Sequence, residues 1–243
     1  MKSALFHITT PLGRTTPAAL RGAFGHYVLQ LYRTGGIPAG HAQLFTNKDF
    51  NTQKPIEGYA KIQFRWLRGG HHIWTMNEGV DALRMLLGGG PLNNFELNGS
   101  VIPELLIEET EYAENHVPES TLHRYEYSIQ GFIPFNQEKA KQYQGAEGML
   151  EKVGLIEQIL LNELVLFSYA ANWNLGGHIL QPKILNIDPR KDFIYTTNDK
   201  GSGKKITHYE KQFDVVFSCN CLLPGGIALG RHKSYGAGVT QAQ

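Results

Sequence analysis

The sequence predicts an α+β fold of two tandem ferredoxin-like domains, the second ending in a glycine-rich loop. Over the first half, hydrophobic patterns follow one another in the order strand, helix, strand, strand, helix, strand, which is the β-α-β-β-α-β unit. A polar stretch around Pro118 then separates this half from a second strand-led half. We therefore expect one domain over residues 1–115 and another over residues 120–243.

The first half opens with a short strand at Ala4–Ile8 and a helix at Pro17–Arg33. Thr16 can cap this helix, and Pro17 suits its first turn. Its apolar residues recur at helical spacing, whereas His26 falls on the opposite face. A polar loop of about twenty residues, longer than a compact domain needs, is expected next. The remaining predicted elements are strands around Ile62–Trp66 and up to Met76, a helix at Glu78–Leu87, and extended chain to Thr110.

The segment Ile62–Trp66 alternates apolar and polar residues, as a half-buried strand does. We expect Ile62, Phe64 and Trp66 to face the core. Gln63 and Arg65 then face outward, where they are candidates for contact with a ligand.

The second half begins with a predicted strand at Tyr125–Phe132. No clear helix is predicted late in this half, so the two domains are not expected to be exact duplicates. The other predicted elements are helices at Gln137–Tyr143 and Met149–Asn172, and strands at Ile179–Ile187, Phe193–Thr197 and Ile206–Cys221.

Composition describes an ordinary globular chain of 243 residues, with 42% hydrophobic and 19% charged residues. The net charge is +1, so a polyanion partner needs a local basic patch. The N-terminus has no signal-peptide pattern, and charged residues interrupt the apolar stretch Leu155–Ala171. We expect no membrane association and a reducing, cytoplasmic setting. Cys219 and Cys221 have no second pair at zinc-site spacing, so no metal site is predicted.

The C-terminal segment from Pro224 to Val239 carries five glycines among the cations Arg231 and Lys233. Glycines let backbone amides approach a phosphate, and successive amides form an anion-binding nest. The spacing fits neither a Walker loop nor a dinucleotide fingerprint. A flexible glycine-rich turn in a β-protein is the alternative interpretation.

The pattern Gly230-x-x-x-x-x-Gly236-x-Gly238 resembles the C-terminal glycine-rich loop of the RAMP superfamily of CRISPR-associated RNA-binding proteins. Other segments resemble its repeat-processing endoribonucleases in particular. They spread over nearly the whole chain in the expected order: Leu20–Gly25, Tyr59–Arg65 followed by Asn77–Val80, Phe135–Gln137 with Tyr143, and Ile159–Leu164.

The resemblance implies two ferredoxin-like domains that bind CRISPR repeat RNA and cut precursor crRNA without a metal or cofactor. In that chemistry a ribose 2′-hydroxyl attacks the adjacent phosphate, leaving a cyclic phosphate and a 5′-hydroxyl. The reaction needs a base, an acid and cationic stabilisation of the transition state. Other subunits of a CRISPR effector complex are a further class of partner that the resemblance implies.

In the family the active site is built from the first helix and the loop after it. His41 precedes Leu44-Phe45 much as the family's histidine precedes an apolar pair, although the interval is shorter here. It is the first candidate for proton transfer, because histidine serves as base or acid near neutral pH. His26 on the polar helix face is the second candidate, and Lys48 can supply charge.

Phosphate contacts are expected mainly from the glycine-rich loop. Tyr235 can stack on an unpaired base or pack in the core. The candidate RNA-binding residues are Arg21, Gln63, Arg65, Gly230, Arg231, Lys233, Tyr235, Gly236 and Gly238.

Three functions stay open on the sequence alone. The first is the endoribonuclease. The second is a non-catalytic RAMP subunit that holds guide RNA in an effector complex, since it would use the same domains and loop. The third is an unrelated ferredoxin-like enzyme that binds a small phosphorylated ligand.

Overall fold

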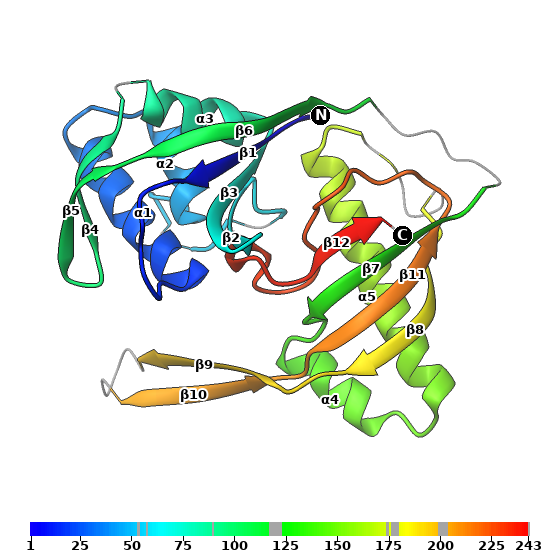
Figure 1. The fold of residues 1–243 in the computed structure, drawn as a ribbon. Helices are drawn as coiled ribbons and strands as arrows, with labels where there is room; N and C mark the ends of the chain where they lie inside the picture. Colours follow the sequence, from blue (N-terminus) through cyan, green and yellow to red (C-terminus); the bar gives the residue numbers. More distant parts are fainter. Residues whose placement is uncertain are drawn as a thin grey trace. The chain divides into compact units, whose positions relative to one another are not determined.

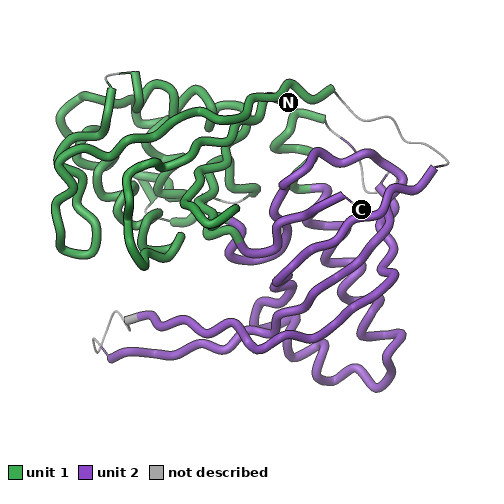
Figure 2. Tube along the Cα trace, in the orientation of Figure 1, with its two compact units in different colours: residues 1–117, 166–174, 234–236 green, residues 118–165, 175–233, 237–243 purple. Residues whose placement is uncertain are grey.

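The computed structural model describes residues 1–52, 54–56, 58–88, 90–116, 123–173, 175, 180–198 and 204–242. It divides into two compact units, which Figure 2 colours separately. Unit 1 comprises residues 1–117, 166–174 and 234–236, and unit 2 comprises residues 118–165, 175–233 and 237–243. Unit 1 thus includes two short segments from the second half of the sequence. The predicted boundary at Pro118 lies outside the described residues.

Unit 1 is built on the predicted four-stranded sheet (Figure 1). All neighbouring strands are antiparallel, and the order is β2-β3-β1-β6. The first and third strands of the unit are therefore central, as in a β-α-β-β-α-β fold. The strands are β1 (Lys2–Ile8), β2 (Ile62–Leu67), β3 (Gly70–Met76) and β6 (Ile107–Glu114).

One face of this sheet packs against helices, and the rings of Phe6, Phe24 and Phe64 lie in the core between them. Residues 39–46 form a helix, α2, although the sequence predicted that they belong to a polar loop. Ala42 and Phe45 are buried against the core, and this burial outweighs the polar character of the surrounding sequence. The helices are α1 (Pro17–Arg33), α2 (Ala39–Thr46) and α3 (Glu78–Leu87); a hairpin of β4 (Leu92–Leu97) and β5 (Ser100–Leu105) follows.

The other face of the sheet is covered at β2 and β3, which corrects the predicted sidedness of β2. Gln63 and Arg65 are buried, with relative exposures of 0% and 2%, whereas Trp66 at the end of the strand is 52% exposed. Tyr59 packs its ring edge against Phe167, from the later segment of unit 1, at a centroid distance of 5.1 Å. Alternation of apolar and polar residues predicts one solvent-exposed face, but both faces of β2 are buried over most of its length.

Unit 2 repeats the strand order of unit 1. Its antiparallel sheet runs β12-β7-β11-β8, so the fourth, first, third and second strands are neighbours again. No α-helix was predicted late in this half. Between β11 and β12 the described residues form only a short 3-10 helix, Lys233–Tyr235, in agreement with that prediction. The elements are β7 (Tyr125–Phe132), α4 (Gln137–Gly145), α5 (Met149–Ala170), β8 (Lys183–Pro189), β11 (Phe213–Cys219) and β12 (Val239–Ala242).

A two-stranded ribbon, β9 (Phe193–Asn198) and β10 (Lys205–Glu210), lies between β8 and β11 in the chain. The segment predicted as one strand from Ile206 to Cys221 is therefore two strands, one in the ribbon and one in the sheet. The predicted start of the preceding strand at Ile179 lies outside the described residues.

Helix α5 is long and apolar enough, by length and composition alone, to cross a membrane. Within unit 2, however, Ile156, Leu160 and Leu164 are buried. Two of its three glutamates also have partners within unit 2: Glu157 accepts a hydrogen bond from the Ile184 amide (2.9 Å), and Glu163 pairs with Lys233 (2.6 Å). We interpret α5 as a core helix.

Candidate functional site

Helix α1 forms one wall of a pocket in unit 1. Thr16 caps its N-terminus by accepting a hydrogen bond from the Ala19 amide (3.1 Å). Leu20, Phe24 and Val28 bury one stripe of the helix. This fixes the rotation of the helix, so that the opposite side carries the pocket residues.

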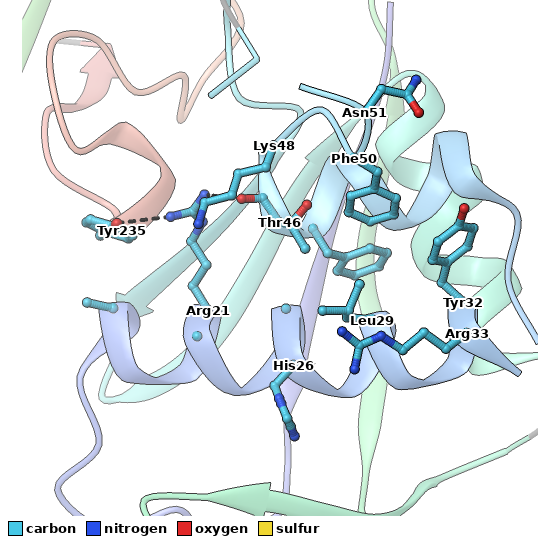
Figure 3. A pocket seen from close by; sticks show the side chains of 14 residues that line it. Arg21, His26, Leu29, Tyr32, Arg33, Thr46, Lys48, Phe50, Asn51 and Tyr235 are labelled. Carbon is cyan, nitrogen blue, oxygen red and sulfur yellow. Dashed lines mark hydrogen bonds between the residues drawn. The ribbon is translucent and has the colours of Figure 1, made fainter. Parts of the chain in front are cut away.

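The pocket has a volume of about 590 Å³. Figure 3 shows Arg21, Lys48 and Tyr235 at one end and Tyr32 with Phe50 at the other. The exposed side chain of His26 lies between these ends along α1 and points to the opposite side of the helix in this view. The polar and aromatic lining residues are Arg21, His26, Tyr32, Arg33, Thr46, Lys48, Phe50, Asn51 and Tyr235.

Arg21 is held in place by two hydrogen bonds. Its Nη1 donates to the Tyr235 hydroxyl (2.9 Å), and its Nη2 donates to the Thr46 carbonyl (3.0 Å). The guanidinium also lies 5.1 Å from the centre of the Tyr235 ring. The structure therefore brings a residue of the glycine-rich segment against the first helix, within unit 1. A guanidinium fixed in this way is preorganised to receive a phosphate.

The loop after α2 carries Lys48, Phe50 and Asn51 into the pocket. It turns at Asn47, whose φ of 51° is left-handed. The Asp49 carboxylate then accepts hydrogen bonds from the amides of Asn51 (2.9 Å) and Thr52 (2.7 Å). These hydrogen bonds, those to Thr52 first, lower the pKa of Asp49. Asp49 therefore stabilises the conformation of this loop.

His26 has a polar neighbour on its own helix. The Gln30 side-chain nitrogen lies 2.9 Å from His26 Nε2. An amide NH₂ group only donates, so this arrangement makes Nε2 the acceptor and places the proton of the neutral ring on Nδ1. Gln30 therefore orients the ring at the edge of the pocket.

His41 lies on α2, outside the set of residues that line the pocket. Its Nδ1 is 3.3 Å from the Met85 sulfur on α3. It is one helical turn before Phe45, which does line the pocket. Of the three predicted catalytic residues, His26 and Lys48 therefore line the pocket, although their side chains point in different directions in Figure 3.

Gln63 and Arg65 are placed in the interior instead of on the expected outer surface. Arg65 Nη2 donates to Gln63 Oε1, and its guanidinium lies 4.7 Å from the Trp74 ring centre. Burial lowers the pKa of Arg65 to about 10, so the side chain stays charged at neutral pH. Neither side chain is accessible to a phosphate in this structure.

This buried pair leads to a prediction about stability. Gln63→Leu should lower the free energy of unfolding by about 2–4 kcal/mol, because it leaves a buried charge without its acceptor. Arg65→Met should cost less, since it removes the charge and keeps an apolar stem of similar length. Urea denaturation of both variants checks this, and a larger loss for Arg65→Met would contradict it.

The three predicted glycines of the C-terminal loop have left-handed backbones, with φ of 88° at Gly230, 79° at Gly236 and 70° at Gly238. A Cβ atom at Gly238 would lie 2.0 Å from the Leu229 carbonyl oxygen, and one at Gly236 would lie 3.0 Å from the Phe64 carbonyl oxygen. Close packing of the protein on itself thus requires glycine here. The sequence pattern does not distinguish this reason from close approach to a phosphate.

The cations of this loop are paired with two glutamates in unit 2. Glu163 accepts hydrogen bonds from the Gly230 amide (3.1 Å) and Lys233 Nζ (2.6 Å). Glu210 pairs with Arg231 (3.0 Å) and with His232 (2.7 Å). A carboxylate thus takes the place in the predicted nest that a phosphate was expected to take. An RNA phosphate would have to displace Glu163 to use these donors.

Five polar or aromatic pocket residues were missed at the level of the sequence: Tyr32, Arg33, Thr46, Phe50 and Asn51. A helical signal existed for Tyr32, because it follows Arg21 by eleven residues, about three helical turns, and falls on the same side of α1. No comparable signal exists for Phe50 and Asn51, since their direction depends on the turn that Asp49 organises. Among the described residues, no group of three His, Cys, Asp or Glu side chains is placed to hold a metal ion.

The fold has close counterparts among solved structures. A crystal structure of Cas6b aligns with a TM-score of 0.72 at 15% identity, with all of both chains covered. A CRISPR RNA processing endoribonuclease Cas6b and Csf5, a type IV Cas6 crRNA endonuclease, each align at a TM-score of 0.59, at 15% and 14% identity and with full coverage of both chains. No protein-family model and no curated protein sequence matches the chain. The chain therefore has the fold of the Cas6 proteins, two ferredoxin-like units.

Proposed function

We propose that the protein is an endoribonuclease that binds CRISPR repeat RNA and cleaves precursor crRNA. The observation that carries this proposal is the pocket of unit 1, where a histidine, a lysine and a fixed arginine line one cavity along α1. The shared fold supports it, because the similar structures include a CRISPR RNA processing endoribonuclease and a crRNA endonuclease.

The pocket supplies groups for metal-independent cleavage. In the proposed reaction a ribose 2′-oxygen loses its proton and attacks the adjacent phosphorus, while the bond to the 5′-oxygen breaks and that oxygen gains a proton. The products are a 2′,3′-cyclic phosphate and a 5′-hydroxyl. His26 is proposed to move one of the protons, because imidazole can serve as base or acid near neutral pH. Its ring, which points to the opposite side of α1 in Figure 3, would have to turn toward the pocket to do so. Arg21 and Lys48 stabilise the charge on the phosphate oxygens.

His41 remains a candidate for the second proton transfer. It would have to act from α2, one turn beyond the pocket lining, and its ring would have to leave Met85. The loop residues Gly230, Arg231 and Lys233 remain candidates for binding RNA after rearrangement of the glutamate pairs.

The test is incubation of purified protein with end-labelled repeat RNA in EDTA. We expect a single cut that leaves a cyclic phosphate, and a single 2′-deoxy substitution at the scissile nucleotide should abolish it. Cleavage that requires an added divalent ion, or that tolerates the 2′-deoxy substitution, would contradict the mechanism. Tight binding without any cut would instead favour a non-catalytic RNA-binding subunit.

A further inference from the structure

We propose that the pocket along α1 holds one unpaired nucleotide of the bound RNA, with its base stacked on Tyr32, which Phe50 supports, and its phosphate directed toward Arg21 and Lys48. The inference deepens the proposed function and rests on it. It assigns to two aromatic residues the task of placing the RNA strand in the pocket.

The aromatic end of the pocket is the first observation. The rings of Tyr32 and Phe50 lie 4.9 Å apart, centre to centre, and are tilted by 37°. Phe50 packs against the core of unit 1, whereas Tyr32 is 37% exposed. Tyr32 thus presents an aromatic surface at the pocket, supported from behind by Phe50. Proteins bind unpaired bases by stacking them on surfaces of this kind.

The charge of the pocket is the second observation. The described lining residues include Arg21, Arg33 and Lys48 but no aspartate or glutamate. This is unusual in a chain with 23 basic and 22 acidic residues. None of the three cations forms an ion pair within the described part of the chain. The pocket therefore attracts an anion and leaves the cations available to it.

The surface of α1 inside the pocket is the third observation. Gly22 lies in the helix interior, where glycine costs roughly 0.5–1 kcal/mol relative to alanine. A Cβ atom at Gly22 would meet no other atom within 4 Å, so packing of the protein does not require glycine there. Gly25 also lines the pocket, and a Cβ atom there would make only an ordinary contact with Thr46 at 3.7 Å. The bare helix leaves room for a ligand to lie against it.

The dimensions fit a nucleotide. Arg21 and Tyr32 are eleven residues apart on α1, which corresponds to about 16 Å along the helix axis. That length accommodates a base at the aromatic end and a phosphate at the cationic end. Asn51, beside the base position, carries both a donor and an acceptor that can bond to a base edge. Charge, stacking surface and polar edge together fit a nucleotide better than inorganic phosphate alone.

The experiment uses 2-aminopurine placed in turn at each position of a non-cleavable 2′-deoxy repeat RNA, and in a short unstructured oligonucleotide. Stacking on Tyr32 should quench the fluorescence at one position in the repeat. Tyr32→Leu and Phe50→Leu should remove this quenching and weaken binding by about 5- to 150-fold, the range for loss of one stacked base. Tyr32→Phe should retain both. Tyr169→Leu is the matched control, because Tyr169 is an exposed tyrosine of unit 1 that does not line the pocket.

The outcomes separate this inference from the proposed function. Binding and cleavage of the repeat by the wild type, with no quenching that depends on Tyr32, would overturn the nucleotide site and leave the nuclease intact. Failure to bind or cut the repeat would overturn the proposed function. In that case the short oligonucleotide tests the nucleotide site by itself: quenching that depends on Tyr32 supports the site, and absence of quenching overturns it. Circular dichroism melts confirm that each variant is folded.

Discussion

The His26→Ala variant is expected to cleave repeat RNA about 100- to 10,000-fold more slowly than the wild type, the usual range for loss of a proton-transfer group. Its affinity for the RNA should change little, because phosphate binding rests on Arg21 and Lys48. Single-turnover cleavage with saturating protein, together with filter binding of a 2′-deoxy repeat, separates the two effects.

The matched control is His41→Ala. The ring of His41 lies against Met85 outside the pocket lining, so its loss should slow cleavage less than the loss of His26. The reverse order would move the centre of the reaction from the α1 pocket to the α2–α3 surface. Equal, small effects of both variants would remove histidine from the mechanism.

The Gly238→Ala variant should lose about 3–5 kcal/mol of unfolding free energy. A Cβ atom there would lie 2.0 Å from the Leu229 carbonyl oxygen, on a backbone with a φ of 70°. Both the left-handed backbone and the collision contribute to this loss of stability. A loss of this size is large for a single substitution and is expected only where such a structural cause exists. Guanidinium chloride denaturation followed by tryptophan fluorescence measures it.

Gly225 provides the control within the same loop. It is exposed, and a Cβ atom there would meet nothing within 4 Å. Gly225→Ala should therefore change the unfolding free energy by no more than about 0.5 kcal/mol. Equal stability of the Gly225→Ala and Gly238→Ala variants would contradict the packing role assigned to Gly238.

Much of the fold could be predicted because its periodicity is local. The stripe of Leu20, Phe24 and Val28 defines α1, and the order of elements defines the ferredoxin-like unit. The sidedness of β2 could not be predicted, since chain from much later in the sequence packs over buried Arg65: a Cβ atom at Gly236 would lie 3.2 Å from Arg65 Cγ. Burial that depends on distant sequence leaves no local pattern.

The candidate site shows the same division. Arg21, His26, Lys48 and Tyr235 were chosen from the sequence, and one pocket contains all four. The loop cations Arg231 and Lys233 were also chosen, but their glutamate partners lie far away in the chain and were not anticipated. Residue type therefore identified groups able to bind a phosphate, whereas only the structure shows which of them are already paired.

The most direct measurement is photocrosslinking of the scissile nucleotide. A 2′-deoxy-4-thiouridine replaces that nucleotide in repeat RNA, and mass spectrometry identifies the crosslinked peptides. If the reaction takes place in the α1 pocket, crosslinks will map to residues 21–33, 45–51 or Tyr235. Crosslinks confined to the β9–β10 ribbon or to α4, with none at these positions, would contradict this assignment.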